Sequence, residues 1–205
     1  EADTIGGFNS LIAKQKKEEG TALISTVLFD DQTEVLYDRI SLDRIEPMND
    51  RQYYVRGCTA LLDALGGAIH HIGNVHKYAR EEDRPEKTIF IITTDGMENS
   101  SHRYTYDKVK KMVERQRDRY GWEFLFLGAN IDAIEVAGRF GVQANRAVNY
   151  ECDSEGTQLN YEVLSKAVSR VRTCAAPTAA MAFDECDDWA EEIRADYSKR
   201  HRGKR

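Results

Sequence analysis

The stretch IFIITTDGMENSS, residues 89–101, decides the fold. It places four large apolar residues and two threonines directly before Asp95 and Gly96. An uninterrupted apolar run of this kind is typical of a strand that is buried on both faces, as the strands of parallel sheets are. An acidic side chain beside a buried strand is costly unless something pairs with it. The stretch therefore predicts a buried strand at 88–94 that ends in a polar turn, and it predicts a partner for Asp95.

The rest of the chain alternates between strand patterns and helix patterns. Apolar and alternating runs predict strands at 22–29, 33–40, 88–94, 123–128 and 145–150, and helical periodicity predicts helices at 4–19, 59–78, 105–120, 131–141 and 159–172. Such alternation indicates a parallel sheet that is covered by helices on both faces. We predict an α/β fold with a doubly wound, mostly parallel sheet, in which 33–40 is an antiparallel edge strand with one solvated face.

The character of the chain changes after residue 173. Residues 1–173 are predicted to form one domain, and residues 174–205 to form a linker, a short amphipathic helix and a basic tail. Trp189, Ile193 and Tyr197 recur at four-residue spacing and would form one stripe on that helix. Two interpretations remain open: the helix docks on its own domain, or it binds a partner. The tail, SKRHRGKR, is expected to be frayed and solvated, with contact to nucleic acid as the alternative.

Composition limits the possible functions of the 205-residue chain. Its net charge of −6 argues against nucleic acid as the main partner, which usually requires a basic face. No apolar run approaches the roughly 18 residues of a membrane span, so no membrane partner is expected. Neither the cysteines nor the histidines have the spacing of a zinc site. We interpret the cysteines as reduced thiols of a cytoplasmic protein. These cysteines are Cys58, Cys152, Cys174 and Cys186.

Asp95 and Thr59 are the candidate metal ligands. In open parallel sheets, ligands bind at the carboxyl ends of the strands, and Asp95 ends a strand there. Thr59 lies in a loop that enters the next helix on what should be the same rim. Magnesium favours oxygen ligands from one or two carboxylates, hydroxyls and water. The alternatives are an Asp-Gly turn in which the carboxylate bonds its own backbone, and a threonine N-cap.

Two motifs together resemble the von Willebrand factor A domain family. They are Gly57-x-Thr59-Ala60-Leu61-x-Asp63-Ala64-Leu65 and Thr94-Asp95-Gly96-x-x-Asn99, and the order of predicted elements agrees with the family from residue 1 to about 172. The segment FLGANIDA, 126–133, is similar to the intracellular bacterial branch. The resemblance implies a metal-ion-dependent adhesion site in which Thr59 and Asp95 hold Mg²⁺ or Mn²⁺. It also implies a partner-binding rim of Arg56, Gly57, Gly96, Met97, Glu98, Asn99 and Asn130.

The chain departs from the family at one point. The family's Asp-x-Ser-x-Ser loop, which supplies further metal ligands, is absent, so metal affinity is expected to be poor without it. The resemblance places the first strand of the family between 22–29 and 88–94. We expect an upstream segment of the same gene product to occupy that position, or else a strand from a second copy, because unpaired backbone groups there would be costly.

The resemblance implies a non-enzymatic binding module. A carboxylate of a partner protein would complete the coordination of the metal, and the loops 51–58, 97–103 and 128–132 would give specificity. Bacterial relatives often work beside AAA-type ATPases, so such an ATPase is one expected partner. The alternatives are a structural module whose metal site has decayed, and a metal-dependent hydrolase or phosphoryl-transfer enzyme that uses Asp95. Against the enzyme, the chain lacks the Walker A, G-x-S-x-G and G-x-G-x-x-G motifs.

Overall fold

Three parallel strands form where the apolar runs predict them. The computed structural model describes residues 1–55, 57–185 and 188–201. Strand β3 (Ile89–Thr94) pairs with β4 (Glu123–Gly128), and β4 pairs with β5 (Ala147–Asn149), in both cases in parallel. All residues of β4 are buried, as expected of a strand with neighbours on both edges and helices on both faces.

A separate hairpin contains the other two strands. Strand β1 (Leu23–Phe29) pairs in antiparallel fashion with β2 (Thr33–Ser41), and the register shifts around Thr26. Opposite this irregularity, Arg39 has a positive φ of 50°, and its N–H donates to Ser25 Oγ at 3.0 Å. The bulge therefore keeps the hairpin paired on either side of a local distortion.

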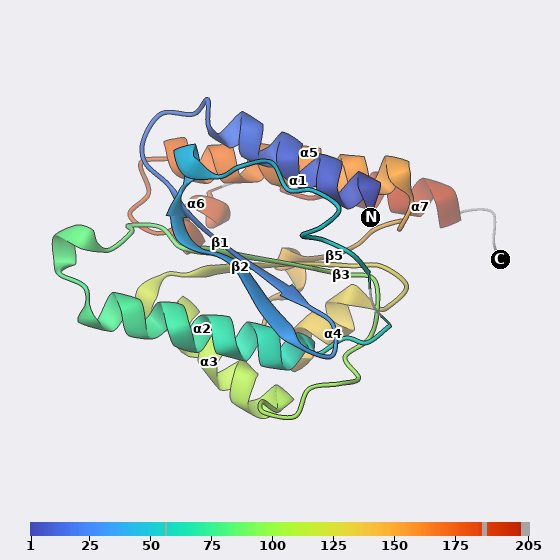
Figure 1. Cartoon of the computed structure of the whole chain (residues 1–205), viewed down its shortest axis with the longest axis horizontal. Coiled ribbons are helices and arrows are strands. Elements are labelled where there is room, and N and C mark those ends of the chain that lie inside the picture. The colour runs from blue at the N-terminus through green and yellow to red at the C-terminus, as the bar shows by residue number, and fades with distance from the viewer. Residues whose placement is uncertain (56, 186–187, 202–205) are drawn as a thin grey trace.

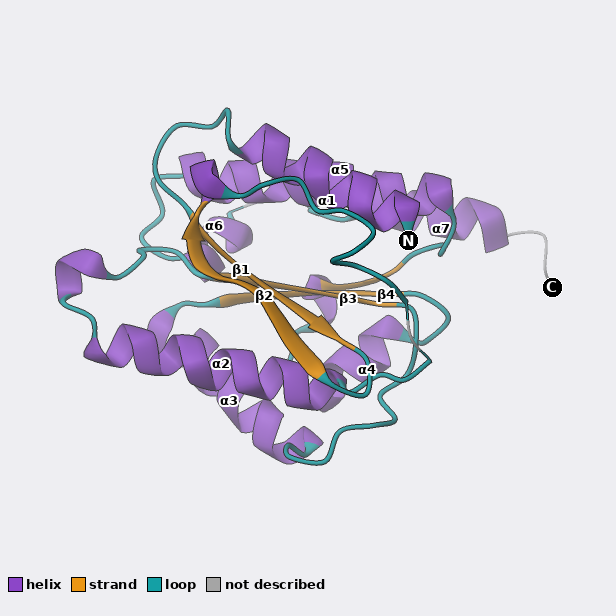
Figure 2. Cartoon of the chain, viewed as in Figure 1, coloured by secondary structure: helices purple, strands orange, loops and turns teal. Residues whose placement is uncertain are grey.

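The predicted α/β class is confirmed, but a doubly wound single sheet is not seen among the described residues. The strands form a two-stranded sheet, β1-β2, and a three-stranded sheet, β3-β4-β5, and no backbone hydrogen bond joins β1 to β3, both of which lie wholly within the described residues. The architecture is a mixed α/β fold in which both sheets lie between two layers of helices (Figure 1). Figure 2 shows the orange strands between the purple layers.

Helices α1 and α5 form one layer, and α2, α3 and α4 cover the opposite side (Figure 1). The bounds are α1 (Ala2–Gln15), α2 (Leu61–Tyr78), α3 (Tyr106–Tyr120), α4 (Ala133–Arg139) and α5 (Ser154–Thr173), and short 3₁₀ turns occur at Leu42–Arg44, Glu81–Asp83 and Ala144–Arg146. Among the described residues, no helix is long and apolar enough to cross a membrane.

Side-chain caps set several helix ends. Asp132 accepts from Glu135 N at 3.0 Å, and α4 consequently begins two residues after the predicted position 131. Asp153 accepts from Gly156 N at 2.8 Å, and α5 consequently begins five residues before the predicted Leu159. Helix α3 ends at Tyr120, and the next residue, Gly121, adopts the left-handed conformation with φ of 64°.

The predicted linker is instead part of the core. Helix α6 (Ala179–Asp184) forms here. Its residues Ala179, Ala182 and Phe183 are buried in the cluster that also contains residues of β4 and α5. Periodicity missed this helix because small alanines carry little hydrophobic signal, although they allow close packing. Helix α7 (Glu191–His201) follows, with Ile193 buried in the same cluster.

The segment before α7 is also docked. Trp189 packs against the same cluster, and its Nε1 donates to Asn145 O at 2.9 Å. Tyr197 is half-buried and stacks on His201. Of the two interpretations of the Trp189 stripe, the structure therefore matches docking on the chain's own domain. The final four residues of the predicted basic tail, 202–205, lie outside the described residues.

Candidate functional site

The turn after β3 leaves Asp95 at the surface. The hydroxyl of Thr94 donates to Gly96 O at 3.1 Å and accepts from Gly96 N at 3.3 Å, so Thr94 closes the turn. The Asp95 side chain is exposed at the carboxyl end of β3. The Thr94 hydroxyl thus makes the hydrogen bonds to the turn backbone that the Asp-Gly turn interpretation assigned to the Asp95 carboxylate.

Thr59 lies against this turn. Its N–H donates to Asn99 Oδ1 at 2.9 Å, and its C=O accepts from Asn99 N at 3.0 Å. A Cβ added to Gly96 would lie 3.2 Å from Thr59 Oγ1, which shows how closely the hydroxyl approaches the turn. Two segments that are distant in the sequence therefore bring Thr59 and the Asp95–Gly96 turn together.

Thr59 is not the N-cap of α2. The N-cap position is Ala60, and the first turn is capped from another loop, because Glu98 Oε2 accepts from Leu62 N at 2.9 Å. Ser101 Oγ accepts from Asp63 N at 3.0 Å. Glu98 and Ser101 thus do for α2 what a threonine cap would do.

Asp63 fixes the loop that carries Glu98 and Asn99. Its carboxylate accepts from the backbone N–H groups of His102, Arg103 and Tyr104, each at 2.9 Å. Burial acts to raise the pKa of Asp63, but the three N–H donors outweigh it and the pKa lies below its ordinary value. The ionised Asp63 therefore holds the 96–104 loop beside the start of α2.

The predicted rim residues differ in their contacts and in their exposure. Glu98 and Asn99 are engaged in holding the loops, as their hydrogen bonds above show. Asn130 adopts a positive φ of 58° and its Nδ2 donates to Asp95 O at 3.4 Å, which brings the β4–α4 loop to the same turn. Gly57 and Met97 are exposed, with Met97 58% accessible, whereas Arg56 lies outside the described residues.

Sequence reasoning missed three neighbours of Asp95. Burial raises the pKa values of Tyr53, Tyr150 and Cys152, and the nearby charge of Asp95 adds to each rise. Tyr150 directly follows β5 and Cys152 lies two residues further on, so the rule that ligands gather at carboxyl strand ends could have identified them. Tyr53 belongs to a loop without any motif, and no sequence signal marks it.

The oxygen donors near the Asp95–Gly96 turn are few for a divalent cation. Thr59 offers a hydroxyl and Asp95 a carboxylate, both of which are oxygen donors that Mg²⁺ accepts, with water completing an octahedron. In the described part of the chain, no group of three or more His, Cys, Asp or Glu residues could hold a metal. A cation here would therefore rely on two side chains and on water or a partner's oxygen.

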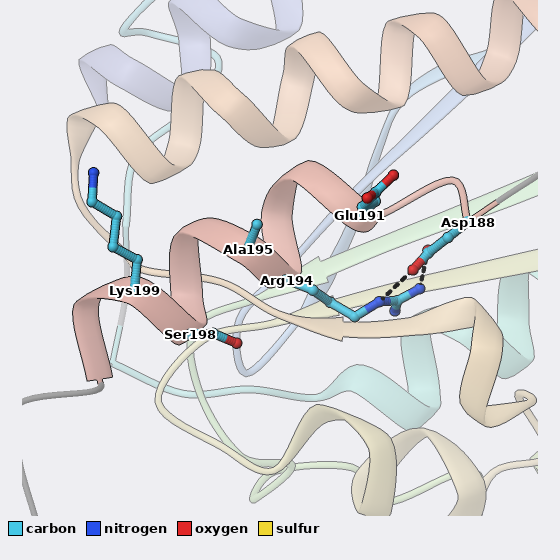
Figure 3. Close-up of a pocket in the computed structure, with 6 residues that line it drawn as sticks. All are labelled: Asp188, Glu191, Arg194, Ala195, Ser198 and Lys199. Carbon is cyan, nitrogen blue, oxygen red and sulfur yellow. Dashed lines mark hydrogen bonds and ion pairs between the residues drawn. The ribbon is translucent and has the colours of Figure 1, made fainter.

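The remaining histidine, cysteine and acidic groups form no second candidate metal site among the described residues. His71 pairs with Asp38 at 2.9 Å, and Cys58, Cys152 and Cys174 are free thiols, whereas Cys186 lies outside the described residues. A shallow hollow beside α7 is lined by Asp188, Glu191, Arg194, Ala195, Ser198 and Lys199 (Figure 3). Arg194 turns back onto Asp188 in this hollow, so its charge is already paired.

Comparison with known proteins supports only the fold. No family model matches the chain, and no curated protein sequence matches it. Among solved structures, the chain is similar to proximal thread matrix protein 1 from the mussel byssus, with a TM-score of 0.54 and 14% sequence identity. The match covers 82% of this chain and 42% of that protein, so the chain spans less than half of that protein's length.

Proposed function

We propose that the chain is a non-enzymatic protein-binding module of the von Willebrand factor A type. Its rim at the carboxyl ends of β3 and β4 binds an acidic side chain of a partner protein through a divalent cation, Mg²⁺ or Mn²⁺. The cation bridges two oxygen-rich surfaces and so removes the cost of facing carboxylates. The observation that carries the proposal is the approach of the Thr59 hydroxyl to the Asp95–Gly96 turn.

Two further observations support this proposal. The capping of α2 by Glu98 relieves Thr59 of the structural role that would otherwise explain it. Exposed apolar side chains lie in the flanking loops, with Tyr54 and Val55 on one side of Thr59 in sequence and Met97 next to Gly96. Such residues would give a partner contact area around a central charge.

Manganese titration followed by NMR tests the metal site directly. Mn²⁺ is paramagnetic and broadens the signals of nearby amides, so it reports position as well as binding. Because metal affinity is expected to be poor without the Asp-x-Ser-x-Ser loop, the titration uses the chain with that loop restored. We expect broadening centred on the amides of Thr59, Gly96 and Asn99, and a rise in melting temperature, because a ligand of the folded state stabilises that state. Displacement by excess Mg²⁺ should restore the signals.

Asp95→Ala should abolish both the local broadening and the rise in melting temperature. Glu81→Ala is the matched control, because Glu81 is an exposed carboxylate beyond the far end of α2 and its loss should change neither result. If Mn²⁺ causes no localised broadening, or if Asp95→Ala retains it, the cation-dependent proposal is wrong. The structural module without a metal is then the better description.

A further inference from the structure

Helix α3 carries a row of basic side chains on its solvent-facing side. These side chains are exposed and recur at spacings of three or four residues, which place them on one face of the helix. We call this row the basic stripe, and it consists of Lys108, Lys111, Arg115 and Arg119. Because a helix rises ~1.5 Å per residue, the stripe is about 16 Å long.

The neighbours of α3 leave the basic stripe open to solvent. Helix α3 lies at the lower edge of the molecule in Figure 1 and contacts α2, α4 and β4. On one flank Gln116 faces α2, because a Cβ added to Gly73 would lie 3.2 Å from its Nε2. On the other flank Glu114 lies beside Gly141, which follows α4. The stripe lies between these flanks, on the side away from the buried Val113.

The cations of the stripe have no carboxylate partner within the part of the chain that the structure describes. Many arginines of the chain do pair with an Asp or Glu, namely Arg39, Arg80, Arg117, Arg146, Arg194 and Arg200. Lys108 Nζ lies 4.3 Å from the centre of the Tyr104 ring, a contact that leaves its positive charge in place. The stripe thus gathers unpaired positive charge in a chain whose net charge is −6.

Like charges at these spacings oppose helix formation. Each member of the stripe is one turn from the next, and neighbours of the same sign at that distance destabilise a helix. The described residues offer no ion pair to the stripe that would offset this cost. Local choices that disfavour the fold and gain nothing within it are expected at functional sites. A partner therefore explains the stripe better than the stability of α3 does.

A row of acidic residues limits the width of the stripe. Asp107, Glu114 and Asp118 follow one another along a single side of it, at spacings of whole helical turns. A broad polyanion, such as a DNA duplex or an anionic membrane, would meet these carboxylates together with the cations. A narrow acidic segment can contact the cations and avoid the carboxylates. Charge complementarity therefore favours one acidic segment of a protein.

We propose that the basic stripe binds an acidic helix of a partner protein, which presents a carboxylate at every third or fourth residue along one face. Carboxylates at every fourth residue of a helix repeat at ~6 Å, which matches the repeat of the stripe. Arg115 and Arg119 can each hold a carboxylate through two parallel hydrogen bonds, whereas the two lysines act as point charges. This proposal does not depend on the cation site.

Fluorescence anisotropy with a helical peptide probe tests the basic stripe in the 205-residue protein. The probe is a labelled alanine-based helix with blocked ends and glutamate at every fourth position, about 16 residues long. EDTA is present throughout, so no divalent cation at the rim contributes and the result is independent of the proposed function. We expect saturable binding at ~50 mM salt that weakens about tenfold or more at ~200 mM, because salt screens exposed charges.

Charge reversal locates the binding surface. Lys111→Glu together with Arg115→Glu should weaken binding of the probe about tenfold or more, because attraction becomes repulsion at the centre of the stripe. Lys14→Glu together with Lys17→Glu is the matched control. These two exposed lysines lie at the end of α1, in the opposite helix layer, and their reversal changes the net charge equally. The control should leave binding unchanged.

A second probe keeps the test valid even if a variant is less stable. This probe has lysine in place of each glutamate. It should bind the variant with Lys111→Glu and Arg115→Glu, but neither the parent protein nor the α1 control. Loss of folding cannot produce such a gain of binding.

Three outcomes would overturn the proposal. The first is the absence of saturable binding of the glutamate probe at low salt. The second is an equal loss of binding in the two double variants, because attraction would then follow overall charge rather than the stripe. The third is tighter binding of a DNA duplex or of anionic lipid vesicles than of the probe, lost on reversal of the stripe, because the ligand would then be a broad polyanion.

Discussion

Ile91 of β3 and Leu125 of β4 lie opposite each other in the same ladder, but Ile91 is 38% exposed and Leu125 is fully buried. The two strands have similar sequences, IFIITT and EFLFLG, and the apolar runs predict the same environment for both. They differ in their neighbours, because β4 has a strand on each edge and β3 has a strand on one. Burial in this sheet therefore follows from position in the strand order rather than from composition.

The amino end of β4 provides the largest expected effect. Glu123 is buried there and pairs with Arg146 at 3.0 Å. Arg146 also pairs with Asp184, the last residue of α6, at 2.6 Å. Arg146→Met should cost about 3–5 kcal/mol of unfolding free energy, because it leaves a buried carboxylate without its partner. Urea unfolding measures this, with Arg80→Met as the control, since the ion pairs of Arg80 are exposed and should contribute less than ~1 kcal/mol.

The pH dependence sharpens this prediction. Burial raises the pKa of Glu123, and the Arg146 guanidinium offsets part of the rise. A carboxyl group whose folded-state pKa is raised favours the folded state while it is protonated, and that contribution is lost as pH rises through the folded pKa. The loss caused by Arg146→Met should therefore be larger at neutral pH than below the ordinary pKa of glutamate. An equal loss at both pH values would contradict the buried, unpaired carboxylate as its cause.

Truncation of the paired residues tests the comparison itself. Leu125→Ala should cost about 2–5 kcal/mol, because it removes buried contacts and leaves a cavity. Ile91→Ala removes a side chain of the same size from the exposed position across the ladder, and it should cost less than ~1 kcal/mol. Both are measured by urea unfolding at neutral pH. Equal costs would mean that β3 is as well covered as β4 and that the difference in exposure has no energetic weight.

A smaller effect is expected at the carboxyl end of the strands. Asp63→Asn should cost about 1–2 kcal/mol, because the amide cannot match the charge-assisted bonds to the N–H groups of residues 102–104. The folded-state pKa of Asp63 is lowered, so its contribution is present above the ordinary value of 3.8 and is lost as pH falls through the folded pKa. Below the folded-state pKa of Asp63, the stabilities of the protein and of the variant should therefore converge. Thermal unfolding across the acid range checks this, and a constant difference would contradict it.

Local sequence information predicted where the strands and most of the helices lie. The run before Asp95 gave β3, the pattern at 123–128 gave β4, and the periodicity at 131–141 gave α4. These features depend on residues that are close in the chain, because strand propensity and capping act over a few positions. The rim was also predictable in part, because parallel strands in a known order end at the same side.

The tertiary structure decided the features that depend on residues far apart in the chain. Glu98 caps α2 from another loop, so the Thr59 hydroxyl does not serve as the cap of this helix. Alanine-rich α6 is a helix because β4 and α5 bury it, and its own sequence carries little signal. The separation of β1 from β3 leaves Ile91 exposed in a run that reads as core. The sequence by itself determined where strands and turns form, whereas burial and free edges depend on which segments the fold places next to one another.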